Sequence, residues 1–100
     1  MIDEARERAA AERGRHAKAL LDDAVLTDAF AKVDAALVEA WRKTPHRDTE
    51  ARENYFKAVD LLGKVRAALG EVVTHGEMSA ATLRSISGER QGIVARMVGR

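Results

Sequence analysis

The chain has 100 residues, which is enough for one domain with a thin core. It carries 17 Lys and Arg residues against 16 Asp and Glu residues, so its formal net charge of +1 gives no general attraction to nucleic acid or to an anionic membrane. The absence of cysteine excludes disulfides, thiolate metal ligands and a cysteine nucleophile, and no apolar run approaches the roughly 18 residues of a membrane span.

The first predicted element is a helix over about residues 3–21. Asp3, Glu4 and Glu7 place negative charge at the positive end of the helix dipole. The apolar face of this segment is weak, and Gly14 lowers its helix propensity in the middle. We therefore expect a helix that docks only through its last one or two turns.

The second predicted helix covers residues 24–43. Asp23 is the predicted N-cap, because its carboxylate can accept a hydrogen bond from a free amide of the first turn. The apolar residues follow the alternating 4–3 spacing of a helix that packs lengthwise against another helix. They are Leu26, Phe30, Val33, Leu37 and Ala40.

Residues 44–48 form the predicted turn between the second helix and the third. Pro45 lacks an amide donor and disfavours helical geometry in the residue before it, and Asp48 can cap the next helix. A loop this short makes the two helices antiparallel neighbours. Trp41 is expected to be buried at this end of the hairpin, close to Tyr55; the alternative is an exposed Trp41 that anchors a binding partner.

The third predicted helix, residues 49–75, has the strongest pattern in the chain. Its apolar residues keep the 4–3 spacing without interruption: Ala51, Tyr55, Ala58, Leu62, Val65, Leu69 and Val72. Leu62 and Leu69 are expected to be buried against the second helix, and Gly76 is expected to end the third helix in the left-handed conformation. The apolar face is wider than one partner helix requires, which predicts self-association.

After Gly76, the sequence predicts a short helix from Ser79 to Ile86 and a break at Gly88. The predicted division is therefore a helical hairpin domain of residues 1–87 and a flexible tail of residues 88–100. The tail is more apolar than a solvated end requires, so we expect it to dock on a neighbouring subunit or another partner, with arginines at the rim; the alternative is a disordered end. The predicted docking residues are Ile93, Val94, Met97 and Val98.

The sequence shows no arrangement typical of an enzyme. His16, His46 and His75 are isolated from one another and lack the spacing of metal ligands, and no nucleophile motif is present. The expectation is a protein with no catalytic residues, no cofactor and no metal site.

A net charge of +1 does not exclude nucleic-acid binding, because a basic stripe can exist at low net charge. The stretch from Arg13 to Lys18 and the C-terminal end are locally basic, but no helix-turn-helix is present. If DNA binds, we expect an oligomer to contact its backbone without sequence preference. The candidate contacts are Arg13, Arg15, Lys18, Arg90, Arg96 and Arg100.

A resemblance to a known family rests on several segments spread over about residues 12–83. They are Arg13-Gly14-Arg15, Ala19-Leu20-Leu21-Asp22-Asp23, Ala29-Phe30, Ala40-Trp41-Arg42-Lys43-Thr44, residues 48–53, Val65-Arg66, Leu69 and Gly76. With these segments the chain resembles short helical-hairpin proteins of tailed phages, among them small terminase subunits. That resemblance implies a ring of hairpins that works with a large packaging subunit on viral DNA, in the cytoplasm of a bacterial host. The N-terminal helix-turn-helix usual in that family is absent here, so no DNA-reading residue is carried over.

Together these observations predict an all-α protein: a long antiparallel helical hairpin with an N-terminal helix and a short C-terminal helix or tail. The predicted function is a non-enzymatic homo-oligomeric scaffold or adaptor that is not associated with membranes, and the resemblance specifies it as a DNA-packaging subunit. The residues predicted to form the core or the oligomer contact are Leu26, Phe30, Val33, Leu37, Tyr55, Leu62, Val65, Leu69 and Val72. The alternative function is a small helical regulator or inhibitor that binds a host or phage protein.

Overall fold

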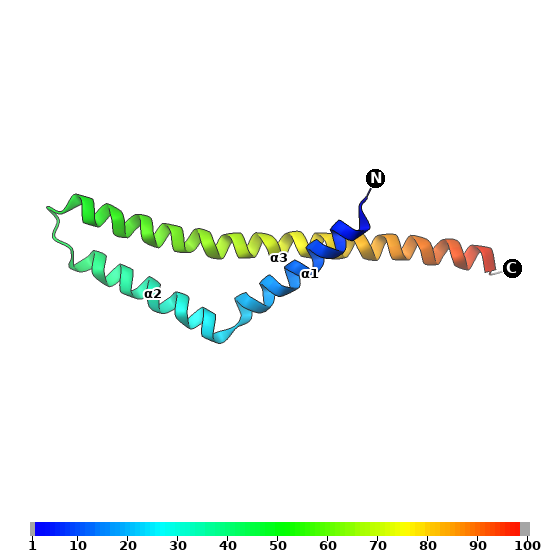
Figure 1. The fold of residues 1–100 in the computed structure, drawn as a ribbon, viewed down its shortest axis with the longest axis horizontal. Helices are drawn as coiled ribbons and strands as arrows, with labels where there is room; N and C mark the ends of the chain where they lie inside the picture. The colour runs from blue at the N-terminus through cyan, green and yellow to red at the C-terminus, as the bar shows by residue number, and fades with distance from the viewer. Residues whose placement is uncertain (1, 99–100) are drawn as a thin grey trace. The chain divides into compact units, whose positions relative to one another are not determined.

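A computed structural model describes residues 2–98 of the chain. The described part is 92% helical and contains three α-helices and no strand, which confirms the predicted all-α fold. In chain order the helices are α1 (Glu4–Asp22), α2 (Ala24–Lys43) and α3 (Thr49–Val98) (Figure 1). The N-terminal helix and the hairpin of α2 with α3 agree with the predicted architecture.

Two aspartates begin the helices of the hairpin, as the sequence predicts. The Oδ1 atom of Asp23 accepts a hydrogen bond of 2.9 Å from the backbone N–H of Leu26 at the start of α2. The Oδ1 atom of Asp48 accepts one of 3.1 Å from the N–H of Ala51 at the start of α3. Each carboxylate satisfies an amide that has no partner inside its own helix, so both predicted N-caps are confirmed.

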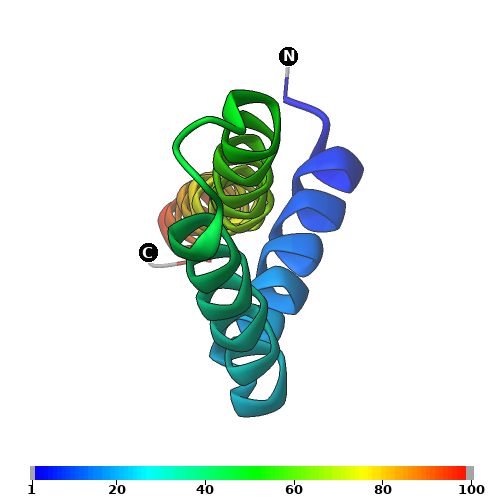
Figure 2. The same ribbon diagram turned by 90° about the vertical axis from the view of Figure 1, so that its left-hand side faces the viewer.

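The end of α2 is determined by Thr44 and the proline that follows it. Thr44 has extended backbone angles (φ −71°, ψ 130°), the conformation favoured before a proline. Its N–H donates to the carbonyl oxygen of Trp41, and its hydroxyl donates to the carbonyl oxygen of Ala40 at 2.7 Å. Two carbonyl groups of the last turn of α2 are thereby satisfied, and the chain turns back into α3 (Figure 2).

α3 is longer than the sequence predicts, because it continues without a break through Gly76 and Gly88 to Val98. The predicted helix end at Gly76 and the separate short helix from Ser79 are therefore wrong. No glycine among the described residues has a positive φ, so Gly76 is not a left-handed cap. Residues 88–98 belong to α3, no helix end marks the predicted domain boundary there, and the flexibility of this segment stays a prediction.

The chain divides into two compact units. The hairpin unit, Lys18–Gly70, contains the end of α1, the whole of α2 and the first part of α3. The crossing unit contains α1 up to Ala17 together with α3 from Glu71 onward. The predicted separation of the first helix (about residues 3–21) from the second (residues 24–43) is confirmed, because α1 ends at Asp22 and α2 begins at Ala24.

Candidate interaction surfaces

In the crossing unit, α1 and α3 touch through two glycines. A Cβ atom placed on Gly14 would lie 2.7 Å from the Cα atom of Gly76 and 3.1 Å from the carbonyl oxygen of Val72. A Cβ atom placed on Gly76 would lie 2.6 Å from the Cα atom of Gly14 and 2.9 Å from the carbonyl oxygen of Ala10. These distances leave no room for a side chain at either position, so the two backbones are in direct contact.

Small residues surround this contact and form the most buried part of the described chain. Ala11 and Ala17 on α1 are each 4% exposed, and Ser79 on α3 is 2% exposed. α1 therefore docks through its middle, and the prediction that it docks only through its last turns is wrong. The physical reason is Gly14, which weakens the helix locally but allows the close approach.

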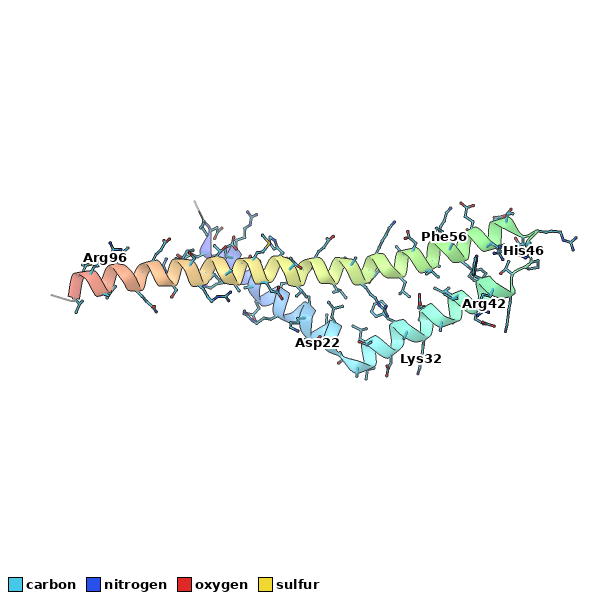
Figure 3. The ribbon with its side chains drawn as sticks, turned by 180° about the vertical axis from the view of Figure 1, so that it is seen from behind. Asp22, Lys32, Arg42, His46, Phe56 and Arg96 are labelled. Atoms are coloured by element: carbon cyan, nitrogen blue, oxygen red, sulfur yellow. The ribbon has the colours of Figure 1, made fainter. Side chains whose placement is uncertain are left out.

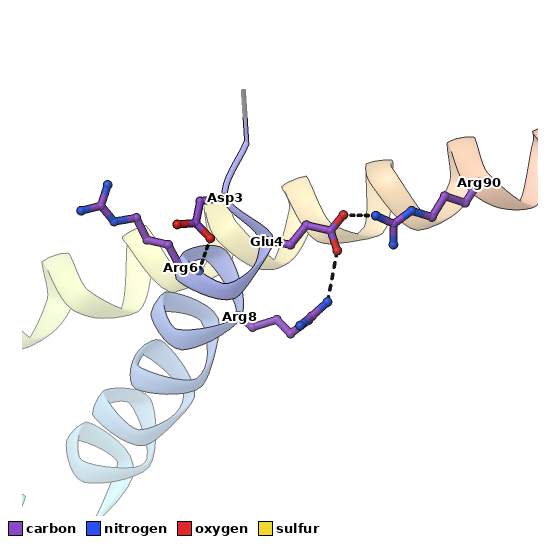
Figure 4. A network of polar contacts seen from close by, with 5 residues as sticks. All are labelled: Asp3, Glu4, Arg6, Arg8 and Arg90. Carbon is purple, nitrogen blue, oxygen red and sulfur yellow. Dashed lines mark hydrogen bonds and ion pairs between the residues drawn. The ribbon is translucent and has the colours of Figure 1, made fainter.

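The beginning of α1 is held to α3 by charge (Figure 4). The carboxylate of Glu4 lies between two arginines: its Oε1 atom accepts a hydrogen bond from Arg90 of α3, and its Oε2 atom accepts one of 3.1 Å from Arg8. Because Glu4 meets Arg90 while Gly14 meets Gly76, α1 runs antiparallel to this part of α3.

In the hairpin unit, two arginines of α3 stack on aromatic rings of α2. The guanidinium carbon of Arg52 lies 4.8 Å from the ring centroid of Trp41, and that of Arg66 lies 4.9 Å from the ring centroid of Phe30. Arg52 also donates hydrogen bonds to the carbonyl oxygens of Thr44 (3.1 Å) and Trp41 (3.4 Å). Trp41 does lie at the loop end of the hairpin, but it is 39% exposed, so its predicted burial is wrong.

These stacked arginines lie along one flank of the hairpin, and the opposite flank is mostly apolar, with Asn54 as its polar member on α3. We call the residues of the 4–3 pattern on α2 and α3 the seam. Arg52 and Arg66 each come directly after a seam residue of α3, Ala51 and Val65, so both lie on the same side of the seam. On the other side of the seam, the residues of α3 that come directly before Tyr55, Leu62 and Leu69 are all exposed. One of them, Leu61, is 63% exposed. We call this surface the open flank; it consists of Ala29 and Ala36 on α2 and Leu61 and Ala68 on α3.

α2 and α3 diverge with distance from the loop (Figure 1). Where they are further apart, the structure leaves a shallow hollow of about 210 Å³. Its lining is mostly apolar: Leu20, Leu21, Leu26, Thr27, Phe30 and Arg66. The seam of the hairpin is thus incompletely filled by the chain's own side chains.

The predicted core residues are only partly covered as a consequence. Those that are half-buried are Leu26, Phe30, Leu37, Tyr55, Leu62, Leu69 and Val72. Val33 and Val65 are 49% and 44% exposed. The predicted burial of Leu62 and Leu69 is wrong, because one diverging helix cannot cover a seam of this width. No large side chain in the described part of the chain is fully buried.

The candidate nucleic-acid contacts fall into different environments. Arg13 is exposed, whereas Arg15 pairs with Glu12 at 3.5 Å and Lys18 pairs with Asp22 at 2.9 Å. Among the C-terminal candidates, Arg90 is held by Glu4, and Arg96 donates to the carbonyl oxygen of Gly92 at 3.4 Å. Arg100 lies outside the described residues. The binding of these side chains to DNA stays a prediction.

The predicted docking residues of the C-terminal segment lie on the last turns of α3, where Arg96 also lies (Figure 3). Their exposed fractions are large: Ile93 52%, Val94 58%, Met97 77% and Val98 77%. These four side chains are therefore accessible to a partner, and their role in docking stays a prediction.

One sequence signal was missed at this end of the chain. The 4–3 spacing continues beyond Val72 through Gly76, Ser79, Leu83, Ile86, Arg90, Ile93 and Met97. The single charged member, Arg90, is the residue paired with Glu4, and the two smallest members lie at the crossing with α1. Carrying the pattern across the glycines would have predicted the full length of α3.

The three histidines are all exposed, and His46 lies in the hairpin loop (Figure 3). Among residues 2–98 no group of three or more His, Cys, Asp or Glu side chains is placed to hold a metal ion.

No helix within the described range is long and apolar enough to cross a membrane. Comparisons with family models, with curated proteins and with solved structures found no match to this chain.

Proposed function

We propose that this protein is a non-enzymatic helical scaffold or adaptor that works as a homo-oligomer. The observation that carries the proposal is the scarcity of buried apolar side chains: in the described part of the chain only Ala11 and Ala17 are buried hydrophobic residues. Folded domains are stable by only about 5–15 kcal/mol, and most of the favourable free energy comes from apolar burial. Association with further copies would bury the half-exposed seam and supply that missing contribution.

The open flank is the surface best suited to this association. Its four residues carry no charge, so burying them has no desolvation cost for an ionic group. The opposite flank carries Arg52 and Arg66, which already stack on rings within the hairpin. Packing one open flank against another would complete the seam in the manner of a helix bundle.

The mass of the protein in native buffer tests this proposal. Sedimentation or light scattering is expected to give a multiple of the 10.9 kDa chain mass. Leu61→Glu should place a charge in the open flank and lower the mass, because an unpaired buried charge is strongly unfavourable. Phe56→Glu is the matched control, since Phe56 is also a large exposed apolar residue of α3, 68% exposed, but lies outside the open flank.

A clean monomer at all accessible concentrations would overturn the scaffold proposal. It would favour the second candidate, a regulator or inhibitor that binds a different protein, which the exposed Phe56 and Leu61 also suit. If Phe56→Glu dissociated the assembly and Leu61→Glu did not, the oligomer would stand and the open flank would be the wrong contact.

The more specific role in DNA packaging rests on the resemblance to small terminase subunits. It would add a large packaging subunit and the DNA backbone as partners of the assembly. An oligomer repeats Arg13, Arg15 and Lys18 once per copy, and each phosphate contact adds to binding. The expected result is weak, sequence-independent binding to duplex DNA that falls steeply with added salt, measured by fluorescence anisotropy. Tight, sequence-selective binding by a monomer would contradict this role.

A further inference from the structure

The apolar seam of α3 extends beyond the part that α1 covers. α1 begins at Glu4, and the carboxylate of Glu4 meets Arg90. Past this ion pair the next seam positions are Ile93 and Met97, which are 52% and 77% exposed. The last turns of α3 therefore present an apolar face with no neighbour inside the described chain.

We propose that a second copy of the chain covers this face, through antiparallel pairing of the segment Ile86–Val98 with the same segment of its partner. The inference rests on the self-association proposed above and assigns one of its contacts. It concerns the crossing unit, and it is separate from the open flank of the hairpin unit.

The position of Arg90 favours the antiparallel direction. In a parallel, in-register pair, equivalent seam residues face each other, so Arg90 would meet the partner's Arg90 in the centre of the contact. In the antiparallel register, Arg90 faces the partner's Ile93, and Ile86 faces the partner's Met97. The aliphatic part of Arg90 can then pack on the partner while its guanidinium group stays with Glu4.

The charges beside the seam match in the same register. Glu89 and Arg96 both directly precede a seam position, so they flank the seam on one side of α3. The antiparallel register brings Glu89 next to the partner's Arg96, and two-fold symmetry repeats this ion pair. Both side chains are exposed, and neither takes part in an ion pair among the described residues.

The size of the contact indicates its strength. The segment has fewer than four helical turns, so each partner buries less than the roughly 800 Å² of a standard interface. We expect a weak contact by itself, which adds to the open flank through multivalency in a larger assembly.

Charge reversal in the full-length chain tests the register. Glu89→Arg or Arg96→Glu alone turns both symmetric ion pairs into repulsions, and we expect the association at this contact to weaken about tenfold. The double variant Glu89→Arg/Arg96→Glu restores opposite charges and should recover most of the lost affinity. Sedimentation velocity over a range of concentrations measures the association, and circular dichroism checks that all three variants keep the helicity of the parent.

Cysteine cross-linking tests the direction independently, because the chain has no cysteine of its own. A mixture of an Ile86→Cys chain and a Met97→Cys chain should form a disulfide-linked heterodimer under mild oxidation. Each variant alone should cross-link poorly, since the antiparallel register separates Ile86 from the partner's Ile86 by several turns. Cross-linking of each variant with itself, and not in the mixture, would overturn the antiparallel arrangement.

The result that separates this inference from the proposed function is the behaviour of the parent chain. A parent that remains a monomer overturns both. A parent that assembles, but whose mass and affinity are unaffected by either charge reversal, overturns only the C-terminal contact. Arg96→Glu that lowers binding to duplex DNA without changing the association would likewise overturn it, and would assign Arg96 to a nucleic-acid surface.

Discussion

The crossing unit and the hairpin unit bring helices together in opposite ways. In the crossing unit α1 and α3 meet through Gly14 and Gly76, and the buried side chains around them are small. In the hairpin unit α2 and α3 carry large apolar side chains, yet none of these is fully buried. Close packing depends on the fit between two surfaces and not on the hydrophobicity of the residues, so the weaker apolar pattern makes the tighter contact.

The difference also indicates how each unit depends on its surroundings. A contact between backbones is complete within one chain, because no side chain of another copy can enter it. A seam of half-exposed leucines and valines is completed only when something else covers it. We therefore expect changes at the crossing to alter stability at any protein concentration, and changes at the hairpin seam to alter stability and assembly together.

The largest effect is expected from filling the glycine contact. Gly14→Ala or Gly76→Ala places a methyl group less than 3.0 Å from a backbone atom of the other helix, so the helices must separate. We expect a loss of about 2 kcal/mol in the free energy of unfolding, despite the higher helix propensity of alanine.

Gly88→Ala is the matched control for the glycine variants. Gly88 lies in the same unit and in the same helix as Gly76, but a Cβ atom there has no neighbour within 4 Å. It should stabilise the protein by up to about 1 kcal/mol. Chemical denaturation of all three variants measures the effects. Equal stabilisation by all three would show that the close contact between Gly14 and Gly76 does not exist in solution.

The next effect is expected at the hairpin seam. Leu62 is half-buried, so Leu62→Ala should cost about 1–2 kcal/mol in dilute solution, less than truncation of a fully buried leucine. The cost should rise with protein concentration, because assembly buries the rest of the side chain. Phe56→Ala at a 68% exposed position should change stability by less than about 0.5 kcal/mol. A cost for Leu62→Ala that is independent of concentration would contradict burial by a second copy.

A smaller effect is expected at the closed end of the hairpin. Arg52→Gln removes the stacking on Trp41 and the hydrogen bonds to the end of α2, and should cost about 1 kcal/mol. Arg42→Gln nearby on α2 removes an equal charge from an exposed side chain and serves as control. The fluorescence of Trp41, the only tryptophan in the chain, should shift in the first variant and not in the second. Identical spectra would show that the stacking does not persist in solution.

The smallest effect is expected at the charged beginning of α1. Glu4→Gln removes the ion pairs with Arg90 and Arg8 and should cost about 0.5 kcal/mol at low salt, because the arginine side chains are largely exposed. High salt should reduce the difference from the parent. Glu12→Gln, which removes only a pair of 3.5 Å within α1, should have a smaller effect. Equal effects from both variants would show that the pair between α1 and α3 adds nothing.

The amino-acid sequence by itself determined the local features of this protein. The caps at Asp23 and Asp48, the turn at Pro45 and the 4–3 spacing of α2 and α3 depend on residues within a few positions of one another, so they can be recognised without a structure. The local reasoning failed at Gly76, because a glycine by itself has the same appearance whether it ends a helix or allows another helix to approach; the only local signal against an end was the 4–3 spacing that continues beyond it. The position of α1 then shows why a glycine stands at this point of α3.

The tertiary structure decided which residues meet across the chain. Glu4 and Arg90 are 86 positions apart, and no pattern in either segment predicts their pairing. The structure likewise decided that the predicted core is half-exposed, because the coverage of a seam depends on the distance and angle between helices, and spacing along the sequence contains neither quantity. The helices of this protein follow from local propensity and periodicity, whereas the close contact and the uncovered surfaces follow from how the helices are placed.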